Sequence, residues 1–334
     1  MTLPTGALAV IFAAAACASL GASSLLVRRI ERFAARLGLS EAILGLVSAL
    51  SANSPEITSA ISALAQGEHD VGIGVVLGSN VFNLAALLGL GALVAGSIRL
   101  HRPVVILTGA VGAWVAGWAV VVVGGGVDPA WGLLAVLVVL VPYVAIAATP
   151  RILERLPLPA RWSGFVRLAL FEEERELAEA VHPRPGTARD AILGAVALAA
   201  VVVASVIMER SATVLGSSFH VPTIIVGGLV LAAVTSLPNA VAAVYLAGRG
   251  RGAAVLSEAM NSNTLNVVVG LLLPASLTGL TNMSGGGGLL AAGFAAALTL
   301  VALVNAYLGR GLGRWSGILL VAGYLAFAAA LLRL

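Results

Sequence analysis

The chain has 334 residues, of which 60% are hydrophobic and only 10% are charged, and its mean hydropathy is +1.04. A soluble domain carries roughly 25% charged residues, so this composition excludes a water-exposed globule, and its low polarity excludes a disordered or fibrous chain. The net charge of +4 comes from arginine alone, and the arginines lie at the ends of apolar runs, which indicates membrane topology rather than nucleic-acid binding. The composition therefore predicts an all-α polytopic membrane protein.

Apolar runs bounded by charged residues, glycine and proline predict ten membrane-spanning helices of about 20 residues or more. In chain order they cover residues 5–27, 41–66, 71–96, 103–125, 129–148, 190–209, 221–247, 253–279, 287–308 and 314–332. The first run lacks a basic leader and is too long for the core of a signal peptide, so we expect it to remain as a span.

One long polar segment, residues 149–189, separates the first five spans from the last five. Its portion 163–181 places apolar residues at helical spacing beside a block of acids, which predicts an amphipathic helix at the interface or under the bundle. We therefore expect three parts: a first five-helix repeat at 1–148, this loop, and a second five-helix repeat at 190–334.

The arginines predict the orientation of the chain in the membrane. All but Arg210 and Arg333 of the 19 arginines fall in the loops after spans one, three, five, seven and nine. By the positive-inside rule these loops, including 149–189, are cytoplasmic and both termini lie outside. We expect a multi-pass protein of the plasma (inner) membrane, whose partners are the lipid bilayer and inorganic cations; the sequence leaves its oligomeric state open.

An internal repeat is the strongest signal in the sequence. Segment 51–83 reads SANSPEITSAISALAQGEHDVGIGVVLGSNVFN, and segment 234–266 reads VTSLPNAVAAVYLAGRGRGAAVLSEAMNSNTLN. At a constant offset of 183, Pro55 aligns with Pro238, and the cluster Ser79-Asn80-x-x-Asn83 aligns with Ser262-Asn263-x-x-Asn266. Five spans per half is an odd number, so the two halves are predicted to be inverted, as in alternating-access transporters.

The two aligned prolines predict breaks in their helices. Pro55 and Pro238 each lie near the middle of an apolar run, where proline lacks an amide proton and clashes with the preceding turn. Each should free backbone carbonyls one turn earlier, around 49–52 and 232–235. At membrane depth such carbonyls are tolerated where they line a polar cavity or bind an ion.

The polar residues of the repeat offer cation ligands. Glu56 follows the first predicted break and Asn239 the second, while Ser79 with Asn83 and Ser262 with Asn266 are pairs four residues apart. Carboxylate, amide, hydroxyl and carbonyl oxygens are the ligands of hard cations such as Na⁺ and Ca²⁺. A single Ser or Asn here is explained equally well by helix packing. The duplicated set with a carboxylate at its centre favours ion binding.

Acidic residues are rare inside the predicted spans. Besides Glu56, only Glu258 lies in a span interior, and a mid-membrane charge costs about 2.5–3.5 kcal/mol on insertion scales. Glu258 precedes Ser262 by one turn, which makes it a candidate accessory charge. It also lies closer to the cytoplasmic end, so a water-facing vestibule position is an equal alternative.

These motifs resemble those of the sodium/calcium exchangers of the Ca²⁺:cation antiporter superfamily, whose two alpha repeats face each other at mid-membrane. Gly78-Ser79-Asn80-Val81-Phe82-Asn83 is close to the family pattern. The resemblance implies a secondary antiporter that needs no cofactor, with Glu56 and Asn239 at the central metal positions. The implied ion-binding residues are Asn53, Glu56, Ser79, Asn83, Thr235, Ser236, Asn239, Ser262 and Asn266.

The second repeat departs from the family pattern. Asn239 stands where the family usually has an acid, Asn261 where it has glycine, and Asn266 where many members have aspartate, while Ala52-Asn53 replaces Thr-Ser in the first repeat. A site with one carboxylate attracts a divalent ion less strongly. Exchange of Ca²⁺ for Na⁺ or H⁺ across the plasma membrane is the expectation, and electroneutral Na⁺/H⁺ exchange on a single carboxylate is the alternative.

Two other classes of function remain besides antiport. A channel or scaffold that has lost coupling would lack trans-acceleration, which distinguishes it from an antiporter by experiment. A membrane-embedded enzyme requires a catalytic set such as HExxH, GxSxG, DxxD or an intramembrane His-Asp pair, and the sequence contains none of them. We therefore expect no enzymatic activity and no catalytic residues.

Overall fold

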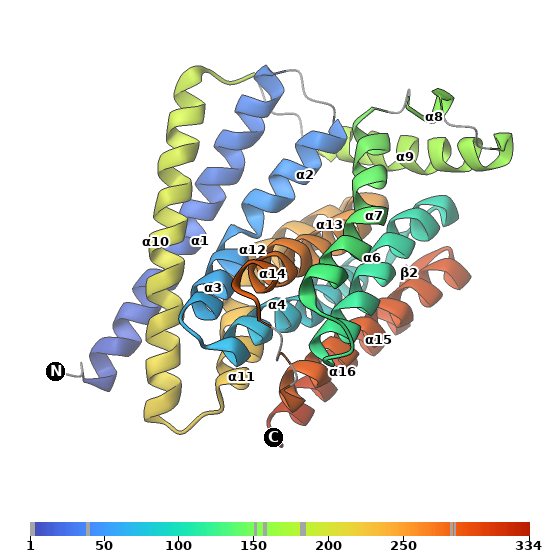
Figure 1. Ribbon diagram of the computed structural model, residues 1–334. Coiled ribbons are helices and arrows are strands. Elements are labelled where there is room, and N and C mark those ends of the chain that lie inside the picture. Colours follow the sequence, from blue (N-terminus) through green and yellow to red (C-terminus); the bar gives the residue numbers. More distant parts are fainter. Residues whose placement is uncertain are drawn as a thin grey trace.

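The computed structural model describes residues 4–37, 41–149, 152–155, 159–180, 185–280, 283 and 285–334. These residues are almost entirely helical. Figure 1 shows a bundle with one long helix pair along its flank and one helix lying across its end. Both termini lie at the opposite end of the bundle from that crosswise helix.

The helices follow the apolar runs. Before the central segment they are α1 (Thr5–Arg36), α2 (Glu41–Ala52), α3 (Ser54–Ala65), α4 (His69–Asn83), π-helical η1 (Leu84–Leu90), α5 (Gly91–Ala95), α6 (Arg102–Val123) and α7 (Pro129–Ala148). The central segment holds α8 (Ile152–Arg155) and α9 (Ala160–Ala180). After it come α10 (Ala188–Ser218), α11 (Thr223–Ile225), π-helical η2 (Val226–Leu231), α12 (Ala232–Gly248), α13 (Gly252–Leu265), π-helical η3 (Asn266–Leu272), α14 (Leu273–Thr278), α15 (Gly286–Gly309) and α16 (Arg314–Leu331). The strands β1 (Ser97–Arg99) and β2 (Gly311–Gly313) pair antiparallel, with Ser97 opposite Gly313.

Eight helical stretches within the described residues are long and apolar enough to cross a membrane. Two of the ten expected segments are not among them. Segment 41–66 is divided at Asn53 into α2 and α3, and segment 253–279, which carries the polar motif residues, forms α13, η3 and α14. The chain is thus a multi-pass helical membrane protein, while ten spans in two inverted repeats stay a prediction.

Proline acts differently in the two motifs. In the first, α2 ends at Ala52 and α3 begins at Ser54, with Pro55 in the first turn. In the second, α12 continues through Pro238, so the break expected there is wrong. A single proline removes one backbone hydrogen bond, which neighbouring groups can replace without ending the helix.

The carbonyl that Pro55 leaves without its helical partner is satisfied by hydroxyls. Ser54 Oγ donates to Ser51 O at 2.7 Å, and Ser23 Oγ on α1 donates to the same oxygen at 3.3 Å. Ser23 also lies 3.4 Å from the carbonyl oxygen of Ala52. The broken helix is therefore bonded to α1 at the break itself.

Helices α1 and α10 form a pair along one flank of the bundle (Figure 1). Hydroxyls of Ser19 and Ser205 meet at 2.8 Å, and Arg29 forms a 2.9 Å ion pair with Asp190. Part of their apolar contact is a small cluster of its own around Leu26, Ala197 and Val201, whereas other buried residues of the two helices, such as Ala15 and Met208, belong to the main core. The pair therefore has contacts of its own besides its packing on the main core.

The centre of the bundle is a close backbone crossing. A Cβ on Gly78 of α4 would collide with the carbonyl oxygen of Gly228 in η2, and a Cβ on Gly74 would lie 2.8 Å from the amide nitrogen of Gly228. Only glycine permits this approach, which brings the two motif regions together. The crossing places the polar residues of α4 beside those contributed by the second half.

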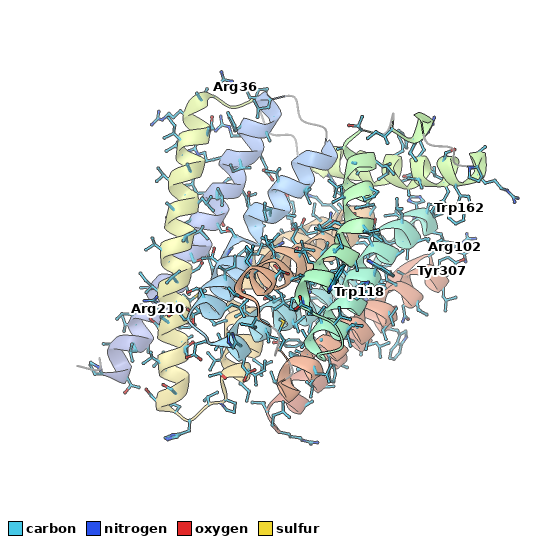
Figure 2. The ribbon with its side chains drawn as sticks, viewed as in Figure 1. Arg36, Arg102, Trp118, Trp162, Arg210 and Tyr307 are labelled. Atoms are coloured by element: carbon cyan, nitrogen blue, oxygen red, sulfur yellow. The ribbon has the colours of Figure 1, made fainter. Side chains whose placement is uncertain are left out.

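Helix α9 covers most of the amphipathic segment expected at 163–181. It contacts α6 and α13 across the end of the bundle (Figure 1). Ala169 and Leu170 are buried, whereas Trp162 in the first turn of the helix is exposed. Figure 2 places Trp162 and Arg36 near this end and Arg210 toward the opposite one. The helix therefore marks one end of the bundle, and both termini mark the other.

Candidate functional site

The nine residues expected to bind the ion are all buried, with at most 2% of each exposed. They come from the break between α2 and α3, from α4, from α12, and from α13 with the start of η3. Helix α3 contacts α4, α12 and η3. The fold therefore brings segments from both motifs around one buried polar region.

Glu56 lies at the centre of this region, in the first turn of α3. Its Oε1 accepts a hydrogen bond from Ser236 Oγ at 3.0 Å, which joins it to α12 of the second half. Beside it, Asn239 Nδ2 donates to Asn53 Oδ1 at 2.7 Å. The break between α2 and α3 and the Pro238 region of α12 are thus bridged by two polar contacts, one of which involves the Glu56 carboxylate.

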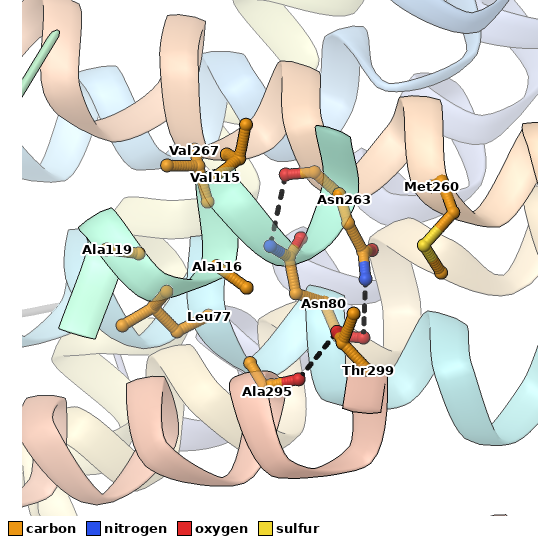
Figure 3. Close-up of a pocket in the computed structure, with 11 residues that line it drawn as sticks. Leu77, Asn80, Val115, Ala116, Ala119, Met260, Asn263, Val267, Ala295 and Thr299 are labelled. Atoms are coloured by element: carbon orange, nitrogen blue, oxygen red, sulfur yellow. Dashed lines mark hydrogen bonds between the residues drawn. The ribbon is translucent and has the colours of Figure 1, made fainter. Parts of the chain in front are cut away.

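A second set of contacts joins the two SNxxN clusters. Asn80 and Asn263 each donate an amide hydrogen to the other's backbone carbonyl, at 3.1 and 3.2 Å (Figure 3). Asn83 Nδ2 donates to Asn263 Oδ1 at 3.1 Å, and Asn266 Nδ2 donates to Asn80 Oδ1 at 3.2 Å. This network fixes the amide nitrogens of Asn83 and Asn266. Asn80 and Asn263, which accept these bonds, were left out of the candidate site by sequence reasoning, although both belong to the repeated motif.

Several oxygens in this region have no protein partner among the described residues. They are Glu56 Oε2, Ser79 Oγ, Asn83 Oδ1, Ser262 Oγ and Asn266 Oδ1. An unsatisfied buried polar group costs about 1–3 kcal/mol, so five such oxygens in one region require an explanation. Their chemistry, one carboxylate with hydroxyl and amide oxygens, fits a hard cation such as Na⁺ or Ca²⁺.

Thr235 behaves differently from the other predicted ligands. Its hydroxyl donates to the carbonyl oxygen of Leu231 at 2.9 Å within its own helix. That bond directs the hydroxyl hydrogen to the backbone and leaves the lone pairs of the oxygen available to a cation. Thr235 therefore stays a candidate ligand, although its hydroxyl, unlike those of Ser79 and Ser262, has a hydrogen-bond partner in the protein.

A small cavity lies behind the asparagine network. It measures about 10 Å³ and is lined by Asn80 and Asn263 together with apolar residues of α4, α6, α13 and α15 (Figure 3). This is room for about one water molecule. Glu56 is not among its lining residues, so the cavity is distinct from the region of the unpartnered oxygens.

Glu258 is only half-buried, unlike Ser262 one turn further along α13. The carboxylate of Glu31 on α1 interacts with it electrostatically. Glu31 itself accepts a 2.6 Å hydrogen bond from Ser48 on α2. Glu31 is thus a second acid whose charge acts on Glu258, and it was not expected from the sequence.

Glu209 is a buried carboxylate that the sequence analysis missed. The predicted span ended at this residue, but α10 continues to Ser218 and leaves Glu209 within the helix with 1% exposed. It accepts hydrogen bonds from Ser62 and Gln66 at 2.9 and 3.0 Å, and from Thr213 at 3.2 Å. The available signal was the absence of proline between Arg210 and Ser218, so nothing in this stretch requires the helix to end at the charged pair Glu209-Arg210.

Comparison with known proteins places this arrangement in a family. The pattern of the sodium/calcium exchanger protein family matches residues 7–171 and 190–333, which is most of the chain. The inner membrane protein YrbG of Escherichia coli is 26% identical over 249 residues, covering 72% of this chain and 71% of YrbG. A putative antiporter, CaxA of Alkalimonas amylolytica, is 34% identical over 80 residues, which span 24% of this chain and only 25% of CaxA.

The fold agrees with that assignment. A solved structure of the sodium-calcium exchanger NCX_Mj superposes with a TM-score of 0.60 at 19% identity, covering 98% of this chain and 99% of that one. Identity this low supports the fold alone, whereas the family pattern covers both halves with their motifs. The chain belongs to the sodium/calcium exchanger family of membrane transport proteins, which confirms the resemblance drawn from its repeated motifs.

Proposed function

We propose that the protein is a secondary active cation antiporter that works by alternating access and exchanges Ca²⁺ for Na⁺ or H⁺ across the plasma membrane. One observation carries the proposal. Glu56 is fully buried, and its Oε2 has no partner among the described residues. Around it the two motifs contribute four further unpartnered oxygens, which together form a ligand set for a hard cation.

The bound ion is expected to be held by both motifs at once. Glu56 supplies the charge, and Ser79, Asn83, Ser262 and Asn266 supply neutral oxygens. Asn53, Ser236 and Asn239 hold the helices together around it through their hydrogen bonds. When the cation leaves, a proton on Glu56 would keep the buried carboxyl neutral, which gives a simple chemical basis for exchange.

Alternating access requires part of the bundle to move past the site. The α1–α10 pair is the candidate moving part, because it has its own apolar contact and its own ion pair. It reaches the site region through Ser23, which bonds the carbonyl groups at the break. Spin-label distances between this pair and α4 should change with ion conditions. Distances that stay fixed would contradict movement of the pair.

The alternative substrate assignment is electroneutral exchange of Na⁺ for H⁺. A specific feature favours it: Asn239, the counterpart of Glu56, is neutral and is already hydrogen-bonded to Asn53. One carboxylate matches the charge of one monovalent cation. A divalent cation prefers a second carboxylate, and Glu258 is the nearest candidate along α13.

The experiment that decides function is ⁴⁵Ca²⁺ and ²²Na⁺ uptake into proteoliposomes under imposed Na⁺ and pH gradients. An antiporter shows acceleration by the counter-ion on the opposite side, whereas a channel does not. Glu258→Gln then separates the substrates. If this variant loses Ca²⁺ flux and keeps Na⁺ flux, the result supports the Ca²⁺ assignment. If the protein carries no Ca²⁺ and the variant exchanges Na⁺ for H⁺ as the wild type does, the result supports the alternative.

The proposed orientation has its own test. A cysteine introduced at Gly126 should react with an impermeant reagent from outside, and one at Gly250 should not, because the arginine distribution places their loops on opposite sides. The reverse labelling pattern would invert the orientation, and with it the extracytoplasmic assignment of both termini.

A further inference from the structure

Glu209 is not explained by the site around Glu56. It lies on α10, inside a stretch that is long and apolar enough to span a membrane, and it is 1% exposed. A carboxylate in such a helix costs about 2.5–3.5 kcal/mol on insertion scales, and a neutral side chain could join two helices at lower cost. The position therefore calls for a role that needs negative charge.

The groups around Glu209 are those of a cation site. Its carboxylate accepts from the hydroxyls of Ser62 and Thr213 and from the amide of Gln66. Each of these side chains also carries an oxygen that can ligate a cation, once hydroxyl hydrogens turn away and the Gln66 amide rotates. One carboxylate with three neutral oxygens balances the charge of a monovalent hard cation.

A series of polar residues on α3 connects the contact with Glu209 to Glu56. Glu56, Ser59 and Ser62 are spaced three residues apart, so each lies about one turn from the next. Ser59 is fully buried, and its hydroxyl has no partner among the described residues. Gln66 is exposed, Ser62 is half-buried, and Ser59 and Glu56 are buried. The unpartnered hydroxyl of Ser59 therefore lies between the solvent-facing end of this series and Glu56.

We propose that Glu209, with Ser62, Gln66 and Thr213, forms an outer binding subsite for a monovalent hard cation such as Na⁺, from which the cation passes Ser59 to reach Glu56. The subsite lies toward the end of the bundle that holds both termini, where Figure 2 places the neighbouring Arg210. The inference rests on the proposed antiport function. It adds that one cation ligand, Glu209, belongs to the α1–α10 pair, so a cation bound in the subsite affects the position of that pair.

Equilibrium binding tests the subsite without relying on transport. ²²Na⁺ binding is measured to the full chain in lipid nanodiscs for the wild type, Glu56→Gln, Glu209→Gln and the double variant. Glu56→Gln should retain a weaker Na⁺-binding component, which the double variant loses. If the double variant binds Na⁺ as Glu56→Gln does, the subsite is overturned, whether or not the wild type transports Na⁺.

Sided flux measurements test the path. In Glu209→Gln the apparent KM for Na⁺ supplied from the side of the termini should rise about tenfold, because the variant loses one favourable charge contact near solvent. The apparent KM for Na⁺ supplied from the α9 side should change less than about twofold. Glu209→Asp keeps the charge and should restore most of the affinity. Equal changes on both sides, or no rescue by Asp, would show that Glu209 only holds α10 against α3.

A matched control separates the subsite from general damage to α10. Ser217→Ala removes an exposed hydroxyl that bonds only the carbonyl of Val214 in its own helix. This variant should leave both KM values unchanged. Absence of cation flux in the wild type under every gradient would defeat the antiport proposal alone, because the nanodisc result still decides the subsite.

Discussion

The two motif regions share a pattern but differ in charge and in backbone. In the first, the helix is interrupted at Asn53 and a buried carboxylate, Glu56, follows at once. In the second, α12 runs on through Pro238, and the neutral Asn239 takes the corresponding position. The halves therefore contribute equally to the frame of the site and unequally to its electrostatics. All the negative charge among the nine expected ligands comes from the interrupted helix.

Removing that charge tests the comparison most severely. Glu56→Gln keeps the shape of the side chain and can still bond Ser236, so the protein should fold and keep its melting temperature. Cation transport should fall by about two orders of magnitude or more, because unit charges 4 Å apart attract by up to ~4 kcal/mol at an effective dielectric of 20. The measurement is tracer flux beside a thermal melt.

The mirror substitution is the control for this prediction. Asn239→Ala removes a neutral group that bonds Asn53. It should reduce transport far less than Glu56→Gln does. A Glu56→Gln protein with full activity would eliminate the carboxylate mechanism for either substrate.

Adding a charge to the second motif sharpens the comparison. Asn239→Glu gives both halves a carboxylate, and a divalent cation gains more from it than a monovalent one. We expect the apparent affinity for Ca²⁺ to rise at least about tenfold relative to that for Na⁺, a ~1.4 kcal/mol difference. Competition of Ca²⁺ against ²²Na⁺ binding measures it. An unchanged ratio would mean that position 239 does not face the ion.

Much of this asymmetry was visible in the sequence, because it depends on local chemistry. The interruption near Pro55 and the positions of the apolar helices follow from residue types and their spacing, and the nine candidate ligands follow from the resemblance of the repeated motifs to a known family. The uninterrupted helix at Pro238 could not be predicted, since one proline is compatible with either outcome until neighbouring groups are placed.

Long-range contacts account for the other omissions. Glu209 is the last residue of the predicted span 190–209, and only the packing of α10 on α3 shows that the carboxylate is enclosed. The roles of Asn80 and Asn263 likewise appear only when α4 and α13 face each other. Spacing within one helix predicts which residues share a face, but it does not predict what that face meets.

The packing of the two motifs should also be unequal. Gly78 of α4 meets the backbone of η2, whereas its counterpart in the second motif, Asn261, is half-buried and carries a full side chain. Gly78→Ala forces a methyl group into a backbone carbonyl and should destabilise the protein by about 1–3 kcal/mol. Asn261→Ala should have little effect on the melting temperature. Equal melting temperatures for the two variants would mean that α4 and η2 can separate at no cost.

The smallest expected effects concern the neutral ligands, where the halves should behave alike. Asn83 and Asn266 each hold their amide nitrogen in the network and leave one oxygen unpartnered. Replacing either by alanine removes a neutral oxygen that water can partly replace, so the apparent cation affinity should fall by about three- to tenfold, or ~0.7–1.4 kcal/mol. Tracer binding to both variants in parallel measures the effect.

Because the two oxygens have equivalent partners across the crossing, the losses of affinity in the two variants should match within about twofold, as expected of contacts worth about 1 kcal/mol each. If either variant lost as much cation affinity as Glu56→Gln does, ligand geometry rather than charge would limit binding. The contrast between the two motifs would then lie in their backbones alone.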